Sequence, residues 1–203
     1  MKNAPRSVMG PGMLAATLTA AVMSLSPAMA QAQNAANVPA EGYLCCNMRT
    51  DGSWISDINY EESGKRIIPA GTPVKFIGFG RYRVETKMNG ESQWLGNDYS
   101  RELDMETFAR RYILDRDPKT VIAKASPKIR VAIESAKVAK GMTREQVVMA
   151  VGYPVSSENP DLNASRWKFW LWSYSPFTVN FDGKGRVTSV ESDADTLPKV
   201  YVP

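Results

Sequence analysis

The residues with the most obvious chemical potential are two adjacent cysteines, Cys45 and Cys46. In an oxidising compartment a pair of cysteines suggests a disulfide. Across a trans peptide the two Cα atoms are only about 3.8 Å apart, which is shorter than the usual disulfide span of roughly 4.4–6.8 Å. Three states are therefore open: a strained vicinal bond that could act as a redox device, an intermolecular bridge, or two thiols on opposite sides of a strand.

Histidine is absent from the chain, and this narrows the possible chemistry. Its absence excludes Ser-His-Asp and Cys-His catalysis, histidine metal ligation and a histidine pH switch. The remaining acidic clusters, Glu61-Glu62 and the pair Asp193 and Asp195, lie in polar, turn-like sequence that is typical of solvated loops. We therefore expect a protein that is not an enzyme and that uses no metal and no cofactor.

The most informative surface residues lie on a predicted strand from Arg166 to Tyr174. Alternation along this strand directs Trp167, Phe169 and Leu171 towards the core. The opposite face then carries a group of basic and aromatic side chains: Arg166, Lys168, Trp170 and Trp172. Tryptophan and arginine dominate binding hot spots, so this face is either a docking surface for a partner or an interdomain surface that the N-terminal part covers.

Before this strand, the first part of the chain has a β pattern that ends in a helix. A plausible strand over residues 43–48 ends at Asp51-Gly52, and a Pro/Gly corner leads into a second strand over residues 74–79. Asn89-Gly90 is the strongest hairpin signal of the chain. Phe108 and Tyr112 have helical spacing within a predicted helix over residues 104–114. Residues 42–116 are therefore predicted to form a β domain with a C-terminal helix.

A charged stretch over residues 117–125, which we interpret as a linker, precedes a helical hairpin. Ser126-Pro127 is a typical helix start and Gly141 a typical stop. Thr143 to Gln146 forms a capping box for a second helix, which ends at Gly152. Three strands follow, over residues 166–174, 176–182 and 186–192. Residues 126–192 are predicted to be a three-stranded antiparallel sheet with two helices on its apolar face, and residues 193–203 an irregular tail.

Three segments of this second part resemble a known family. The first is the run from Lys137 through Gly141-Met142-Thr143 to Gly152-Tyr153-Pro154, the second is the strand Arg166 to Phe169, and the third is the ending Phe181 to Val187. Together they are similar to the SmpA/OmlA (BamE) family of outer-membrane assembly factors. The resemblance implies an α+β fold, which could equally be the broader β-lactamase-inhibitor-like (BLIP-like) fold, and a role in envelope assembly. Members of the family are typically lipoproteins anchored through a cysteine at the mature N-terminus, whereas the first cysteine of this chain is Cys45.

The first part has a resemblance of its own. The segment Ile68 to Phe76, with short strands around a hairpin, resembles bacterial SH3-like modules. The two resemblances together imply an α+β protein with an SH3-like β domain over residues 42–116 and a BamE-like domain over residues 126–192.

The N-terminal segment has the pattern of a cleaved secretory signal peptide over residues 1–30. Lys2 and Arg6 precede an apolar stretch, and Ala28-Met29-Ala30 forms the small-x-small cleavage pattern. These two cations supply two of the four net positive charges of the chain, so the charge does not indicate nucleic-acid binding. We expect a periplasmic protein without a lipid anchor, and residues 31–41 are predicted to be a disordered lead-in.

These features predict a non-enzymatic periplasmic interaction module, an accessory or scaffold of envelope assembly whose partner is another envelope protein and not nucleic acid. Two alternatives stay open: an inhibitor of a periplasmic enzyme, as the BLIP-like fold implies, and a thiol protein that uses Cys45 and Cys46. The oligomeric state is left open by the sequence.

Overall fold

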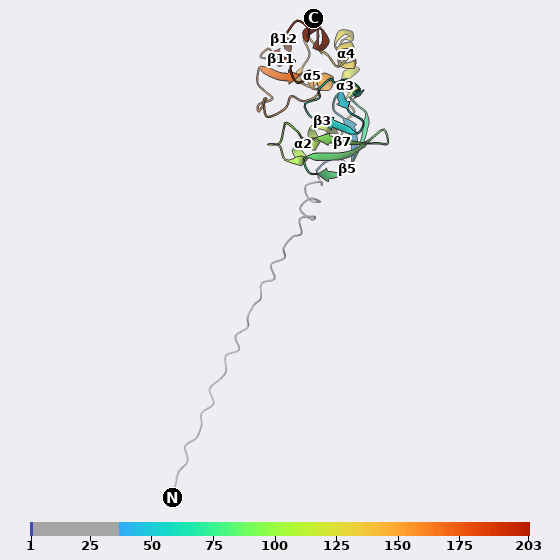
Figure 1. Cartoon of the computed structure of the whole chain (residues 1–203), viewed down its shortest axis with the longest axis vertical. Coiled ribbons are helices and arrows are strands. Elements are labelled where there is room, and N and C mark those ends of the chain that lie inside the picture. Colours follow the sequence, from blue (N-terminus) through green and yellow to red (C-terminus); the bar gives the residue numbers. More distant parts are fainter. Residues whose placement is uncertain (2–36) are drawn as a thin grey trace.

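The computed structural model of this chain describes Met1 and residues 37–203, and it has the predicted mixed α+β character. The predicted signal peptide and residues 31–36 lie outside the described residues, apart from Met1. We call residues 37–116 the N-terminal half and residues 126–203 the C-terminal half. In Figure 1, β3, β5, β7 and α2 lie in one part of the folded chain, and α4, α5, β11, β12 and the C-terminus lie in the other.

The N-terminal half is built on a six-stranded sheet with the strand order β3-β7-β6-β5-β1-β8. Neighbouring strands are antiparallel except for β3 and β7, which run parallel. A separate two-stranded ladder joins β2 and β4. The strand bounds in this half are β1 (Glu41–Leu44), β2 (Met48–Thr50), β3 (Trp54–Ser56), β4 (Arg66–Ile68), β5 (Pro73–Gly80), β6 (Arg83–Met88), β7 (Glu91–Gly96) and β8 (Ile113–Leu114).

The predicted hairpin turn and the predicted helix of the N-terminal half are confirmed. Asn89 and Gly90 both have positive φ angles, 51° and 86°, as the two-residue turn between β6 and β7 requires. Helix α2 (Met105–Tyr112) begins after Asp104, whose side chain accepts a hydrogen bond from the Thr107 N–H at 2.8 Å. It buries Phe108 and Tyr112, the two aromatic residues that predicted it.

The C-terminal half contains the predicted three-stranded antiparallel sheet, in the order β10-β11-β12. Facing residues Phe169 and Phe177 stack with ring centroids 5.2 Å apart. Helix α5 begins with a complete capping box between Thr143 and Gln146 and ends at Gly152, which has a φ of 88°. The elements of this half are α4 (Pro127–Glu134), β9 (Val138–Ala139), α5 (Arg144–Val151), β10 (Arg166–Trp170), β11 (Pro176–Phe181), β12 (Val187–Ser192), α6 (Leu197–Val200) and β13 (Tyr201–Val202).

The end of helix α4 differs from the prediction. The helix ends at Glu134 and does not continue to Gly141, because Ala136 takes a left-handed conformation with a φ of 52°. The N–H of Lys137 then bonds to the carbonyl of Ala132 at 2.8 Å, which completes a C-terminal cap. Glycine usually occupies this position, so the sequence gives no sign that the helix ends before an alanine.

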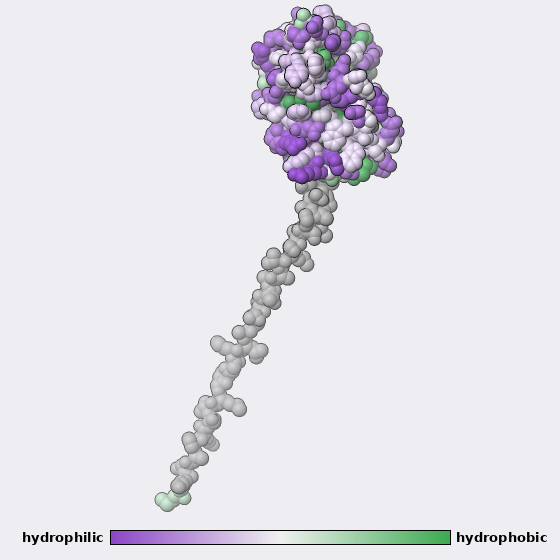
Figure 2. All heavy atoms as spheres, viewed as in Figure 1, coloured by the Kyte–Doolittle hydropathy of each residue, from purple (hydrophilic) through white to green (hydrophobic). Residues whose placement is uncertain are grey.

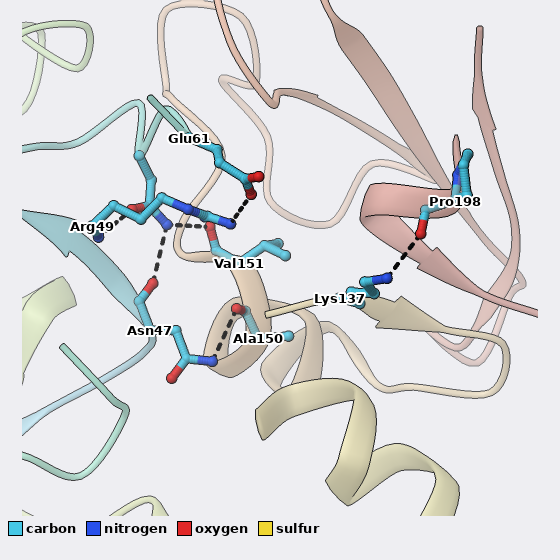
Figure 3. A network of polar contacts seen from close by, with 8 residues as sticks. Asn47, Arg49, Glu61, Lys137, Ala150, Val151 and Pro198 are labelled. Atoms are coloured by element: carbon cyan, nitrogen blue, oxygen red, sulfur yellow. Dashed lines mark hydrogen bonds and ion pairs between the residues drawn. The ribbon is translucent and has the colours of Figure 1, made fainter. Parts of the chain in front are cut away.

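The tail over residues 193–203, predicted to be irregular, is ordered. It forms α6 and then β13, which pairs in parallel with β9. Val200 is buried, and Lys137 Nζ donates a hydrogen bond to the Pro198 carbonyl at 2.8 Å (Figure 3). The prediction failed because a two-residue strand has no periodicity to detect, and its partner lies far away in the sequence.

Three other segments differ from their predictions. The first predicted strand is interrupted at residues 45–47, where the chain turns between β1 and β2. The described part of the lead-in is ordered, since Val38 is buried and the Ala40 carbonyl accepts a hydrogen bond from Phe76 N–H at 3.0 Å. The stretch interpreted as a linker contains α3 (Lys119–Ile122), whose Val121 and Ile122 pack against the core.

The two halves share one hydrophobic core. The same cluster of buried side chains includes Leu44 and Phe108 from the N-terminal half and Val147 and Trp167 from the C-terminal half. The mixed α+β class is confirmed, whereas the arrangement of an SH3-like and a BamE-like domain stays a prediction.

The N-terminal half also caps the end of helix α5. A helix leaves its last carbonyls without helical partners, and in α5 three of these bond to asparagines of the turn before β2 and of the loop after β3. Asn47 donates from its backbone N–H to the Met149 carbonyl at 3.0 Å. Its Nδ2 donates to the Ala150 carbonyl at 3.2 Å (Figure 3). Asn59 Nδ2 donates to the Val151 carbonyl at 2.9 Å. The helix end therefore depends on the other half of the molecule.

At each edge of the three-stranded sheet, a group from outside the sheet forms hydrogen bonds with the backbone of the outer strand. The Asn159 side chain bonds to both the N–H and the carbonyl of Lys168 in β10, at 2.8 and 3.0 Å. On the other side, Val187 of β12 exchanges backbone hydrogen bonds with Met142 and Gly141, both at 2.8 Å. Each edge is therefore closed at one residue.

The surface has no broad apolar region on the face shown in Figure 2. That face is largely hydrophilic, and its apolar residues form small separate patches. Among the helices that the structure describes, none combines the length and the apolar character needed to cross a membrane.

Candidate functional site

Burial alternates along β10 and the following turn as the sequence predicts. Trp167, Phe169 and Leu171 are buried. The residues of the predicted partner-binding face all lie on the opposite side with partial or full exposure: Arg166, Lys168, Trp170 and Trp172. The structure divides these four residues into separate groups.

Lys168 and Trp170 are held by Glu158, from the loop that follows α5. The indole N–H of Trp170 donates to Glu158 Oε2 at 2.7 Å, and Lys168 Nζ lies 3.1 Å from Glu158 Oε1. The same ammonium group lies 4.3 Å from the centroid of the Trp170 ring, a cation–π distance. Both side chains therefore have partners within the chain, and Trp170 is only partly exposed.

Arg166 belongs to a polar group at the other end of the strand. Its guanidinium pairs with Glu191 of β12 at 2.9 Å, and Asn180 of β11 donates to the same carboxylate at 2.8 Å. This ion pair is exposed, so it contributes little to stability. Arg166 is not part of the aromatic group that contains Trp172.

Trp172 lies in the turn between β10 and β11, beside Tyr174. Their side chains are 45% and 82% exposed, and their ring centroids are 5.6 Å apart in an edge-to-face arrangement. The turn is fixed by two backbone hydrogen bonds between its ends, Leu171 N–H to the Ser175 carbonyl and Ser175 N–H to the Trp172 carbonyl, both 2.9 Å. A rigid turn therefore presents two aromatic rings to solvent.

Two tyrosines of the N-terminal half extend this group. The N–H of Glu61, the residue after Tyr60, donates to the Leu171 carbonyl at 2.7 Å, which places this loop beside the turn. The ring centroids of Tyr60 and Tyr99 are 6.4 Å apart, and Tyr99 is 44% exposed. We call Tyr60, Tyr99, Trp172 and Tyr174 the aromatic surface. It combines loops of both halves, and partial burial raises the pKa of the Tyr60 hydroxyl.

A buried carboxylate positions the loop that carries Tyr99. Asp57 accepts hydrogen bonds from the backbone N–H groups of Asp98 and Tyr99, at 3.2 and 3.1 Å, and from the Ser100 hydroxyl. Burial raises the pKa of Asp57 to about 6, an effect that these hydrogen bonds only partly oppose. This arrangement orders the loop that carries Tyr99.

The structure joins Cys45 and Cys46 by a disulfide, and a redox role for this bond stays a prediction. Both side chains are buried, and the Cys45 N–H donates to the Tyr112 carbonyl at 2.9 Å. The intermolecular bridge and the pair of free thiols therefore do not describe this structure. Within the described residues, no group of three or more acidic or cysteine side chains is placed to hold a metal ion.

Sequence reasoning missed four residues of this region. Tyr174 had a detectable signal, because it follows Trp172 in the same turn. Glu158, Tyr60 and Tyr99 had none, since they reach the site from loops far apart in the chain.

No protein-family model, curated protein or solved structure matches this chain. The chain's own residues therefore carry the functional proposal.

Proposed function

We propose that this protein is a non-enzymatic interaction module of the bacterial envelope, an accessory or scaffold of outer-membrane assembly that docks another envelope protein through the aromatic surface. The observation that carries this proposal is the pair Trp172 and Tyr174, held exposed by a rigid turn. The envelope location is supported by the secretory pattern of residues 1–30, and the role in assembly by the resemblance of the second part to the BamE family.

The size of the aromatic surface suits the centre of an interface. A tyrosine or tryptophan buries on the order of 150–250 Å², whereas a standard interface buries about 800 Å² on each partner. Four such residues can form a hot spot, with surrounding polar residues supplying the remaining area. Tyrosine and tryptophan suit this role because each combines a large apolar ring with a polar group.

Docking through side chains fits this structure better than the addition of a strand. A partner strand would need free backbone groups along an edge of the three-stranded sheet. Asn159 occupies those groups at Lys168 of β10, and residues 141–142 occupy them at Val187 of β12. The exposed rings have no comparable cover within the described chain.

Site-specific photo-crosslinking in cells tests the proposal. A crosslinking residue at position 174 should capture one defined envelope protein, and Trp172→Ala should abolish the product. The matched control is a crosslinking residue at Val131, which is 58% exposed on α4 and lies outside the aromatic surface. Equal products from both positions, or a product that Trp172→Ala leaves unchanged, would contradict the proposal.

The stability of the variant separates docking from a structural role. Trp172 is nearly half exposed, so Trp172→Ala should change the free energy of unfolding by no more than about 1 kcal/mol. A loss of about 3–5 kcal/mol, the cost of truncating a buried aromatic, would show that Trp172 belongs to the core.

The exposed turn also favours a second candidate, an inhibitor that inserts Tyr174 into the cleft of a periplasmic enzyme. The 82% exposure of this side chain at a turn supports it. Purified protein should then inhibit an envelope hydrolase, and Tyr174→Ala should relieve the inhibition. Absence of inhibition at micromolar protein would leave the scaffold as the proposal.

A further inference from the structure

A pocket of about 310 Å³ lies where the two halves meet, on the side of helix α5. Its lining is mainly apolar. Leu114 and Cys45 come from the N-terminal half, and Val148, Met149 and Leu162 from the C-terminal half. Such a volume and lining are typical of a site for a small molecule with an apolar body.

Two buried N–H groups of the lining residues have no acceptor among the described residues. They are the indole N–H of Trp167, a residue only 2% exposed, and the Nε–H of Arg144. Buried donors are nearly always paired, and an unpaired one costs about 1–3 kcal/mol. Both groups can only donate, so the missing partner must offer acceptor atoms.

The guanidinium of Arg144 is fixed in position by the chain. Its Nη2 donates to the carbonyls of Asn163 and Ala164, both at 2.9 Å. Its Cζ lies 4.7 Å from the Phe181 ring centroid, so an aromatic face supports the cation. The buried Nε–H, which has no acceptor among the described residues, is therefore a preorganised donor on a permanent positive charge.

The charges around the pocket favour an anion. Arg144 lines the pocket, and Arg111 lies 5.4 Å from the ring centroid of Tyr153, another lining residue. Burial raises the pKa of the Tyr153 hydroxyl, which therefore stays neutral near pH 7. The opposing charge is Glu145, an exposed residue whose carboxylate solvent screens.

We propose that this pocket binds a medium-chain fatty acid, whose carboxylate accepts hydrogen bonds from Arg144 and Trp167 and whose hydrocarbon chain packs against Val148, Met149 and Leu162. An ionised carboxylate is the acceptor that a guanidinium favours, and it provides two oxygens for two donors. The apolar walls explain the preference for a hydrocarbon chain over a small polar acid. This site is separate from the aromatic surface and does not depend on its function.

Calorimetric titration of the full-length protein with decanoate tests the proposal, with decanol as the probe that keeps the chain and removes the carboxylate. Decanoate should bind saturably, and decanol at least about tenfold more weakly. Trp167→Phe, which removes only the indole N–H and some ring area, should also weaken decanoate binding.

Trp167→Phe could weaken binding merely by lowering the stability of the protein, so a second variant is needed. Leu162→Trp fills the pocket from a loop, so it should abolish decanoate binding while the thermal unfolding temperature stays close to that of the parent protein. Val131→Trp, on an exposed position of α4, is the matched control and should bind normally. Trp172→Ala should bind decanoate normally as well, which separates this proposal from docking at the aromatic surface.

Three results would overturn the proposal. These are the absence of saturable decanoate binding to the folded parent protein, equal affinities for decanoate and decanol, and unchanged decanoate binding by Leu162→Trp.

Discussion

Asp57 connects the buried interior to the aromatic surface. Its carboxylate accepts hydrogen bonds from the backbone N–H groups of Asp98 and Tyr99, and the Ser100 hydroxyl of the same loop accepts a hydrogen bond from the N–H of Ser156 at 3.1 Å. Asp57 therefore links the loop that carries Tyr99 to the loop that carries Glu158. Only the low-dielectric surroundings oppose its ionisation strongly, which is why its pKa rises to about 6.

The raised pKa of Asp57 predicts a specific pH dependence of stability. Because this pKa rises from 3.8 to about 6 on folding, the folded protein binds more protons than the unfolded chain between these values. The contribution of Asp57 to stability is therefore present below about pH 4 and is lost as the pH rises through 6. The loss amounts to about 3 kcal/mol by pH 7.

Asp57→Asn removes the titration and keeps an acceptor for the Tyr99 N–H. Urea unfolding at pH 4 and pH 7 should show that the parent protein loses stability relative to the variant as the pH rises. Parallel pH profiles of the two proteins would contradict the assignment to Asp57.

Asn47 and Asn59 have a structural role that the sequence alone does not reveal. Asn47 lies within the strand predicted over residues 43–48, and Asn59 lies outside every predicted element. In the structure both are buried and bond to the last carbonyls of α5. That role depends on a helix about ninety residues later in the chain, so local patterns cannot predict it.

At the scale of elements, prediction succeeded where the signal was local. The Asn89-Gly90 turn, the Ser126-Pro127 helix start and the capping box at Thr143 are all observed. Each depends on backbone groups within a few residues, so neighbouring sequence determines it. The end of α4 and the order of the tail were missed, because one depends on a left-handed alanine and the other on a distant strand.

The capping box of α5 gives a prediction at this scale. Thr143 accepts a hydrogen bond from the Gln146 N–H, and Gln146 Oε1 accepts one from the Thr143 N–H at 2.9 Å. Thr143→Ala should therefore lower the free energy of unfolding by about 1 kcal/mol. Thr143→Ser is the matched control because it retains the hydroxyl, and chemical denaturation of both variants measures the difference. An equal loss in the two variants would mean that the methyl group, and not the cap, matters.

The candidate site was predictable only in part. Strand alternation placed the four residues of β10 and its turn on the correct face, because side-chain direction alternates locally. It could not show that Glu158 holds Lys168 and Trp170, or that Tyr60 and Tyr99 lie beside the turn. These contacts join loops from both halves, and no pattern within one loop encodes them.

At the scale of the whole molecule, we expect the two halves to unfold as one cooperative unit. They share a core, and the C-terminal end of α5 is capped by Asn47 and Asn59. An isolated C-terminal half would leave these carbonyls without their partners, at about 1–3 kcal/mol for each that stays buried.

Differential scanning calorimetry tests whether the two halves unfold together. The protein should unfold in a single transition whose calorimetric and van't Hoff enthalpies agree. Asn47→Ala should move this transition to a lower temperature without dividing it, whereas Asn163→Ala, at an exposed position, should leave it in place. Two resolved transitions would show that the halves fold independently.

The closed edges of the three-stranded sheet have a consequence for how copies of this protein behave at high concentration. Edge-to-edge polymerisation requires two free edges on every copy, so that each new molecule offers another template. Here a side-chain amide occupies one edge at Lys168 and a backbone loop occupies the other at Val187. Growth of a filament through this sheet is therefore opposed at both ends, and the exposed tryptophan and tyrosine rings can be displayed with less risk of fibrous aggregation.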